Sequence, residues 1–232
     1  MTDSRERLIV ALDVSSAAAA KKIVAAVGDS ARIYKVGMQL YTAEGPQIVR
    51  DLIASGREVF LDLKYHDIPN TVAAAVVEAA KLRVSMLTAH AAGGGKMLRS
   101  AVEAARDTNA ATMVLAVTVL TSLDQRDLES VGVRGNVMDQ VSRMAALAIA
   151  SGCHGVVSSA QEASTLRSEL GDGFLIVTPG VRPAGSGHGD QARVVTPAEA
   201  IASGASYIVV GRPITEAPDP AAEAREILAQ IA

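Results

Sequence analysis

Eight short apolar runs alternate along the chain with alanine-rich segments of helical length, and this alternation predicts a TIM (β/α)8 barrel. Strands that are apolar at nearly every position, such as 111–117, are typical of a parallel sheet covered by helices. The chain has 232 residues, 49% of them hydrophobic, which suits a single barrel domain spanning 1–232. An open doubly wound sheet is the structural alternative.

The strand predictions follow the β-branched and apolar runs in chain order: 8–13, 33–37, 58–64, 85–89, 112–118, 155–158, 174–178 and 207–211. The helix predictions follow the alanine-rich segments between them: 17–27, 42–54, 71–81, 96–106, 137–150, 161–170, 197–202 and 220–231. Ile68-Pro69 should end the third strand, because the residue before a proline avoids helical backbone and the proline removes a donor. Asn70 or Thr71 is then expected to cap the following helix.

Charge and cysteine content argue against several classes of function. The 22 basic and 25 acidic residues include no long run of one sign, so we expect neither nucleic-acid nor membrane binding. Cys153 is the only cysteine, which excludes an intramolecular disulfide and favours a reducing compartment. Residues 1–13 lack the features of a signal peptide, and no apolar run approaches the ~18 residues of a membrane span. We therefore expect a cytoplasmic protein.

The third predicted strand ends in charged residues. Side chains alternate faces along an extended strand, so Asp62 and Lys64 lie on the same face. Asp67 follows at the junction between this strand and the next helix. An ordinary solvated ion pair between Asp62 and Lys64 is the alternative interpretation.

Two further charges occupy strand-like segments. Asp13 ends the first apolar run, and Lys35 interrupts the second. A TIM barrel forms its active site at the carboxyl ends of its strands, so these charges should converge there with Asp62 and Lys64.

A candidate phosphate site lies near the end of the sequence. A glycine-rich stretch follows the seventh predicted strand, and Gly211-Arg212 follows the eighth. The loops after these two strands often bind phosphate in TIM barrels, and backbone N–H groups with a guanidinium are suitable donors. The alternative is that Arg182 and Arg212 pair with surface carboxylates.

Two other patterns are weaker. Residues 92–96 are similar to a phosphate-binding loop but lack its first glycine and the Ser or Thr after Lys96, so we expect a strand-to-helix turn. The four histidines show no close metal-ligand spacing, and we assign no metal.

The run Phe60-Leu-Asp-Leu-Lys-Tyr-His-Asp-Ile-Pro-Asn-Thr71 resembles the signature of the orotidine 5'-phosphate decarboxylase family. Further blocks resemble that family in the same order, and together they cover essentially the whole chain: 8–13, 34–37, 88–90, 119–122, 178–183, 189–191 and 210–214. The resemblance implies a homodimeric TIM barrel that converts orotidine 5'-monophosphate to uridine 5'-monophosphate in pyrimidine synthesis. It also implies that no cofactor is needed.

The resemblance implies a role for each matching residue. Lys35, Asp62, Lys64 and Asp67 would form the catalytic charged network. Lys64 would stabilise the C6 carbanion and donate the proton, while Asp67 and Thr71 would reach the neighbouring subunit's active site. The implied substrate-binding residues are Asp13, Lys35, Ile68, Thr71, Thr121, Ser122, Pro179, Arg182, Gln191, Gly211 and Arg212. Of Thr121 and Ser122, either could contact the pyrimidine.

Two other functions are open at this point. Magnesium-dependent sugar-phosphate decarboxylases and aldolases of the same superfamily share the Asp-x-Lys-x-x-Asp pattern of 62–67 but resemble this chain less over 68–71. A barrel that binds nucleotides without turnover is the second alternative, because a fold does not fix a function.

Overall fold

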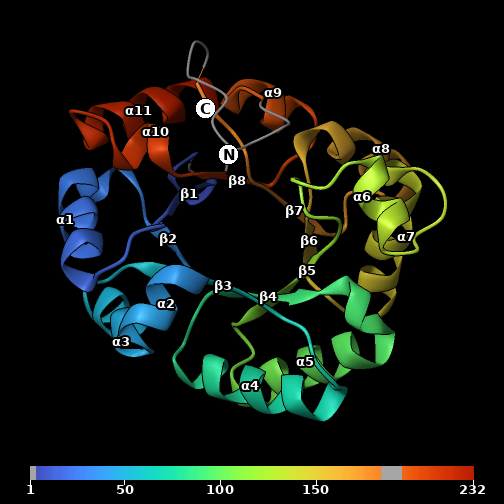
Figure 1. The fold of residues 1–232 in the computed structure, drawn as a ribbon. Helices are drawn as coiled ribbons and strands as arrows, with labels where there is room; N and C mark the ends of the chain where they lie inside the picture. The colour runs from blue at the N-terminus through green and yellow to red at the C-terminus, as the bar shows by residue number, and fades with distance from the viewer. Residues whose placement is uncertain (1–3, 184–194) are drawn as a thin grey trace.

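In the computed structural model, eight parallel strands close into a barrel in chain order, from β1 to β8 (Figure 1). The structure describes residues 4–183 and 195–232. The predicted barrel is therefore confirmed, and each predicted strand overlaps an observed one. The strands are β1 Leu8–Ala11, β2 Ile33–Gly37, β3 Glu58–Tyr65, β4 Met86–His90, β5 Met113–Val117, β6 Gly155–Val157, β7 Leu175–Thr178 and β8 Tyr207–Val210.

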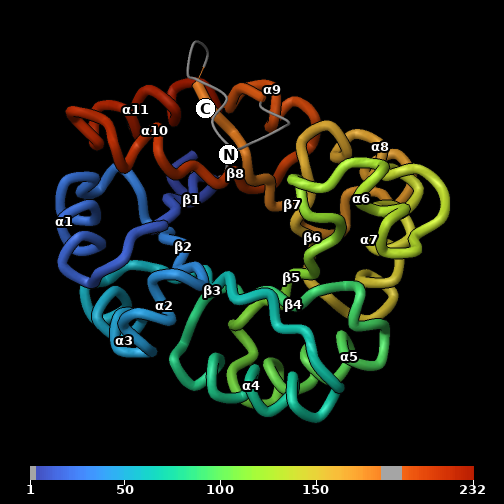
Figure 2. Tube along the Cα trace, viewed as in Figure 1, coloured from blue at the N-terminus to red at the C-terminus, as the bar shows by residue number. Residues whose placement is uncertain are grey.

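Helices surround the barrel, and α1 packs beside α11, so segments near the two ends of the chain meet (Figure 2). The α-helices are α1 Ala17–Val27, α2 Met38–Glu44, α3 Gln47–Ala54, α4 Pro69–Lys81, α5 Gly94–Thr108, α6 Gln125–Ser130, α7 Val137–Ala150, α8 Ala160–Leu170, α9 Pro197–Ala202, α10 Arg212–Thr215 and α11 Pro220–Gln230. The described part of the chain also contains three short 3-10 helices, η1 Ser4–Glu6, η2 Gly28–Ser30 and η3 Ala91–Gly93. None of the helices described is long and apolar enough to cross a bilayer.

Some helix boundaries differ from the predictions for local reasons. The helix expected over 42–54 is two helices, because Gly45 caps α2 with a positive φ of 63° and Pro46 precedes α3. The short helices α6 and α10 were not predicted.

The helix after β3 also begins earlier than expected. Pro69 is the first residue of α4, where its missing N–H costs nothing. The residue before it, Ile68, occupies the cap position without a side-chain hydrogen bond, so the expected capping by Asn70 or Thr71 is wrong. In the segment 92–96, η3 gives way to α5 at Gly94.

The inside of the barrel is apolar in its lower layers and polar at its carboxyl end. The inward-facing apolar residues are Ile9, Ala11, Ile33, Phe60, Met86, Leu115, Val177 and Val209. Because side chains alternate along a strand, the next inward positions after Ile33, Phe60 and Met86 are those two residues further on. These positions hold Lys35, Asp62 and Thr88. A second core packs between the strands and the helices, and the buried Cys153 belongs to it as expected.

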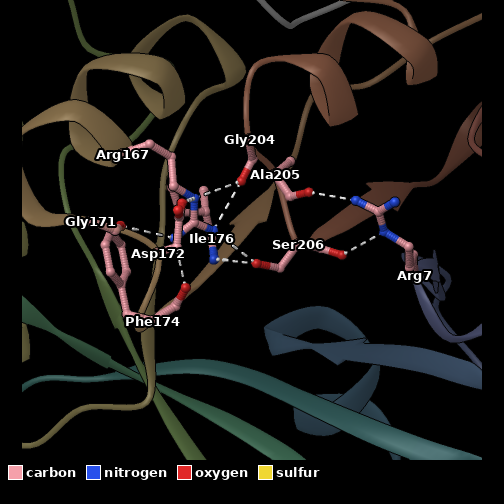
Figure 3. Close-up of polar contacts among 9 residues, drawn as sticks. All are labelled: Arg7, Arg167, Gly171, Asp172, Phe174, Ile176, Gly204, Ala205 and Ser206. Carbon is pink, nitrogen blue, oxygen red and sulfur yellow. Dashed lines mark hydrogen bonds and ion pairs between the residues drawn. The ribbon is translucent and has the colours of Figure 1, made fainter. Parts of the chain in front are cut away.

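Arginine side chains satisfy backbone carbonyls at the amino ends of β7 and β8 (Figure 3). Arg167 on α8 donates to the Gly204 carbonyl from Nε and Nη2, both at 3.0 Å, and from Nη1 to the Phe174 carbonyl at 2.8 Å. Its Nη2 also lies 3.1 Å from the Ser206 hydroxyl, and Arg7 Nε donates to the Ser206 carbonyl. One guanidinium thus connects α8 to the segments before two strands.

We predict that Arg167→Ala lowers the free energy of unfolding by about 2–4 kcal/mol. The substitution removes several charge-assisted hydrogen bonds and leaves the carbonyl oxygens that accepted them without these donors. Chemical denaturation measures this loss. Arg106→Ala is the matched control: Arg106 pairs with Asp107 on the surface, so its loss should change stability by at most about 0.5 kcal/mol. Equal stability of the two variants would contradict the assignment.

Candidate active site

A cavity of about 540 Å³ opens at the carboxyl ends of the strands. Its floor is formed by inward-facing residues of the barrel, including Phe60, Val117, Val157 and Val209. The sequence-predicted site residues that line it are Asp13, Lys35, Asp62, Lys64, Thr121, Pro179, Arg182, Gly211 and Arg212. Residues from both ends of the chain therefore meet around one cavity.

The charges along one wall of the cavity alternate in sign. Lys35 Nζ lies 2.8 Å from Asp13 Oδ1 and 3.8 Å from Asp62 Oδ2. Lys64 Nζ lies 2.8 Å from the same Asp62 oxygen. The side chains of Lys35 and Asp62 are only 12% and 13% exposed, so each buried charge depends on its neighbours of opposite sign. We call Asp13, Lys35, Asp62 and Lys64 the charge row.

Lys64 has an unusual backbone conformation. Its φ is +52°, which is uncommon for a residue other than glycine. The pairing of β3 with β4 shifts register between Leu61 and Tyr65, so Lys64 lies in an irregular part of the strand. Such bulges redirect side chains and are frequent next to active sites.

The predicted phosphate side is formed by the loops after β7 and β8. These strands are neighbours, paired at Val177 with Tyr207. Arg182 follows the first and Arg212 the second, and both line the cavity. The glycines of 185–189 and Gln191 lie outside the described residues.

Among the predicted site residues that the structure describes, four do not line this cavity. Asp67 is exposed, and its Oδ1 accepts a hydrogen bond from the Ile68 N–H at 2.6 Å. Ile68 is 66% exposed, and Thr71 is exposed on α4. Ser122 is also exposed, whereas Thr121 faces the cavity.

Sequence reasoning missed the two stacked imidazoles beside the charge row. His66 and His90 stack with ring centroids 5.3 Å apart and an angle of 17° between planes. The Nδ1 atom of His90 accepts a hydrogen bond from the Ala92 N–H. Burial lowers the pKa of His90, and the nearby His66 and Lys64 lower it further. His66 follows β3 and His90 is the last residue of β4, but only the register of these two strands brings the imidazoles together.

The residues described contain no group of three His, Cys, Asp or Glu side chains arranged to hold a metal ion. The charged side chains that line the cavity include lysines, carboxylates and arginines. A barrel with such a site belongs to the class of enzymes that bind a small anionic substrate and stabilise charge during its reaction.

Comparison with known proteins narrows this class. The family model for the Orotidine 5'-phosphate decarboxylase / HUMPS family matches residues 6–227. Because the match spans nearly the whole chain, this chain belongs to that family.

Relatives agree with this assignment. The chain is 51% identical over 234 residues to the orotidine 5'-phosphate decarboxylase of Moorella thermoacetica, covering 98% of this chain and 93% of the relative. It is 52% identical over 231 residues to that of Afipia carboxidovorans, covering 100% and 97%. The crystal structure of orotidine 5'-phosphate decarboxylase from Lactobacillus acidophilus superposes with a TM-score of 0.89 at 38% identity, covering 97% and 98% of the chains.

The lowered pKa of His90 predicts a contribution to acid sensitivity. Below its ordinary pKa of 6.5, the unfolded chain takes up the proton before the folded chain does, so the free energy of unfolding falls as the pH falls. We predict that His90→Asn loses less thermal stability than the parent chain between roughly pH 7.5 and 5.5. Melting curves across this range measure the difference, and parallel pH profiles would contradict the prediction.

Proposed function

We propose that this chain decarboxylates orotidine 5'-monophosphate to uridine 5'-monophosphate and carbon dioxide, acting as a carbon–carbon lyase in pyrimidine synthesis. The observation that carries the proposal is the charge row, which ends at Lys64 inside the cavity of a barrel of this family. We also propose that the protein is cytoplasmic, because its free and buried Cys153 suits a reducing compartment.

The substrate would lie across the cavity with its phosphate at the arginine side. Arg182 and Arg212 supply positive charge for the phosphate, with Gly211 and Gln191 as the further expected contacts. Asp13 and Lys35 would hold the ribose hydroxyls, and Thr121 would contact the pyrimidine near Pro179. This orientation directs C6 of the ring and its carboxylate toward Asp62 and Lys64.

Lys64 would supply both charge stabilisation and the proton. When the bond between C6 and the carboxylate carbon breaks, its electron pair remains on C6, where no carbonyl group is placed to delocalise it. The Lys64 ammonium stabilises this developing negative charge and then transfers a proton from Nζ to C6. The resulting neutral amine regains a proton from solvent.

Asp62 would act in two ways. Its Oδ2 holds Lys64 Nζ at 2.8 Å, which fixes the ammonium before the substrate reacts. A second carboxylate brought beside this poorly exposed anion would be repelled, and departure of carbon dioxide relieves the repulsion.

We further propose that the enzyme is a homodimer in which Asp67 and Thr71 reach the neighbouring active site. Asp67 and Thr71 are exposed, and neither lines its own cavity. Ile68 and Met38 are large apolar side chains that are 66% and 57% exposed, and a second copy would remove them from water. In the dimer, Ile68 would pack at the pyrimidine of the neighbouring site.

The activity is tested by following orotidine 5'-monophosphate absorbance with purified protein in excess EDTA. We predict turnover under these conditions, because none of the proposed steps uses a metal. Magnesium-dependent activity on a sugar phosphate, without activity on orotidine 5'-monophosphate, would contradict the proposal. It would indicate a sugar-phosphate decarboxylase or aldolase of the same superfamily instead. Tight uridine 5'-monophosphate binding without turnover would instead indicate a binding protein.

The shared active site is tested by mixing two inactive variants. Lys64→Ala and Asp67→Ala should each lose at least about 1000-fold in kcat, because each removes a charge from every site. A hybrid dimer contains one site with both residues intact. After subunit exchange, random mixing should restore about a quarter of the parent activity.

Two results would contradict these assignments. A Lys64→Ala variant that keeps a tenth of the activity would remove Lys64 from its catalytic role. Two inactive variants that exchange subunits without regaining activity would show that Asp67 acts within its own chain. Mixing Lys64→Ala with Asp62→Ala is the matched control, since both residues belong to one chain's site and no hybrid site is intact.

A further inference from the structure

We propose that Thr88 is a positioning residue that holds Lys64 and Asp62 in register for the reaction, an inference that rests on the proposed function. Thr88 lies on β4 and its side chain is fully buried. Its Oγ1 accepts a hydrogen bond from the Lys64 N–H at 2.9 Å and donates one to Asp62 Oδ1 at 3.0 Å. A hydroxyl has one proton and two lone pairs, so it can make both bonds at once.

The irregular pairing of β3 with β4 explains why Lys64 needs this partner. Leu61 pairs with Leu87, and the pairing resumes at Tyr65 with Ala89. Residues 62–64 of β3 therefore stand opposite the single residue 88 of β4. A regular ladder would give each backbone N–H a carbonyl partner, but within this bulge the Thr88 side chain provides the acceptor for the Lys64 N–H.

The same hydroxyl fixes the orientation of the Asp62 carboxylate. The torsion that rotates a carboxylate is broad, so its two oxygens need separate partners to stay in place. Oδ1 receives the Thr88 hydroxyl, while Oδ2 lies 2.8 Å from Lys64 Nζ and 3.8 Å from Lys35 Nζ. Thr88 thus contacts the backbone of one catalytic residue and the side chain of the other.

A second buried threonine provides the control that distinguishes a purely structural role of Thr88 from a positioning role. Thr118, just after β5, is also fully buried at the carboxyl end of the barrel. Its hydroxyl donates to the Val157 carbonyl at 2.9 Å, and the Thr118 N–H is a second donor to that carbonyl. Thr118→Val therefore removes a buried hydroxyl whose hydrogen bond, among the residues described, goes to a backbone carbonyl and to no member of the charge row.

The experiment compares Thr88→Val, Thr88→Ser and Thr118→Val in the full chain. We expect Thr88→Val to lower kcat by about 100-fold, with the Kd for uridine 5'-monophosphate changed by less than about threefold, because small displacements of reacting groups cost rate more than binding. Thr88→Ser keeps the hydroxyl and should stay within about threefold of the parent kcat. Thr118→Val should keep its kcat and lose less thermal stability than Thr88→Val, because the Val157 carbonyl retains the Thr118 N–H as a donor.

A readout independent of turnover is hydrogen exchange at the Lys64 amide. This amide should exchange faster in Thr88→Val, because it loses its acceptor, and at the parent rate in Thr118→Val. Thr88→Ala, which also lacks the hydroxyl, gives the same comparison should Thr88→Val fail to fold.

Three results would overturn the role of Thr88. These are a Thr88→Val kcat within threefold of the parent, an equal loss of kcat in Thr118→Val, and unchanged exchange at Lys64 in Thr88→Val. A parent chain that shows no turnover would instead reject the proposed function. The exchange measurement would still decide whether Thr88 holds the bulge.

Discussion

The hydrogen-bonded pairing of β1 with β8 closes the barrel, and the whole site depends on this closure. It joins Leu8 to Ile208 near opposite ends of the chain and makes the ring of strands continuous. All strands are parallel, so their carboxyl ends share one rim. Asp13, which follows the first strand, therefore lies beside the loop that follows the last strand. A Cβ atom added to Gly211 in that loop would be 4.0 Å from Asp13 Oδ2.

Closure also sets the electrostatic environment of the charge row. The barrel interior beneath it is filled by apolar side chains such as Phe60 and Met86, which leaves little water below the charges. Interactions between ions strengthen as water is removed, but each ion also loses hydration. Alternation of sign from Asp13 to Lys64 gives every buried charge a neighbour of opposite sign before a substrate enters.

The fold and the convergence of the charges could be predicted from the sequence because both follow from local patterns. Apolar runs locate strands, and parallel strands bring residues such as Asp13 and Lys35 to one rim. The split between α2 and α3 also had a local signal in Gly45-Pro46, which the helix prediction over 42–54 overlooked.

By contrast, the positive φ of Lys64 has no local signal, since lysine does not favour it, and only the pairing with β4 imposes it. The Thr88 hydroxyl and the stack of His66 on His90 depend on the same register. Roles that need a second chain, such as that of Asp67, are still predictions.

The arginine contacts at the amino ends of β7 and β8 stabilise the fold at a distance from the residues of the candidate active site. Arg167 and Arg7 secure backbone carbonyls at the end of the barrel opposite the cavity. Loops at the carboxyl rim can accordingly change length or composition over evolutionary time without loosening these attachments. Directed evolution toward other phosphorylated substrates should therefore find its tolerated substitutions in the rim loops, while sequence change near Arg167 is constrained by folding alone.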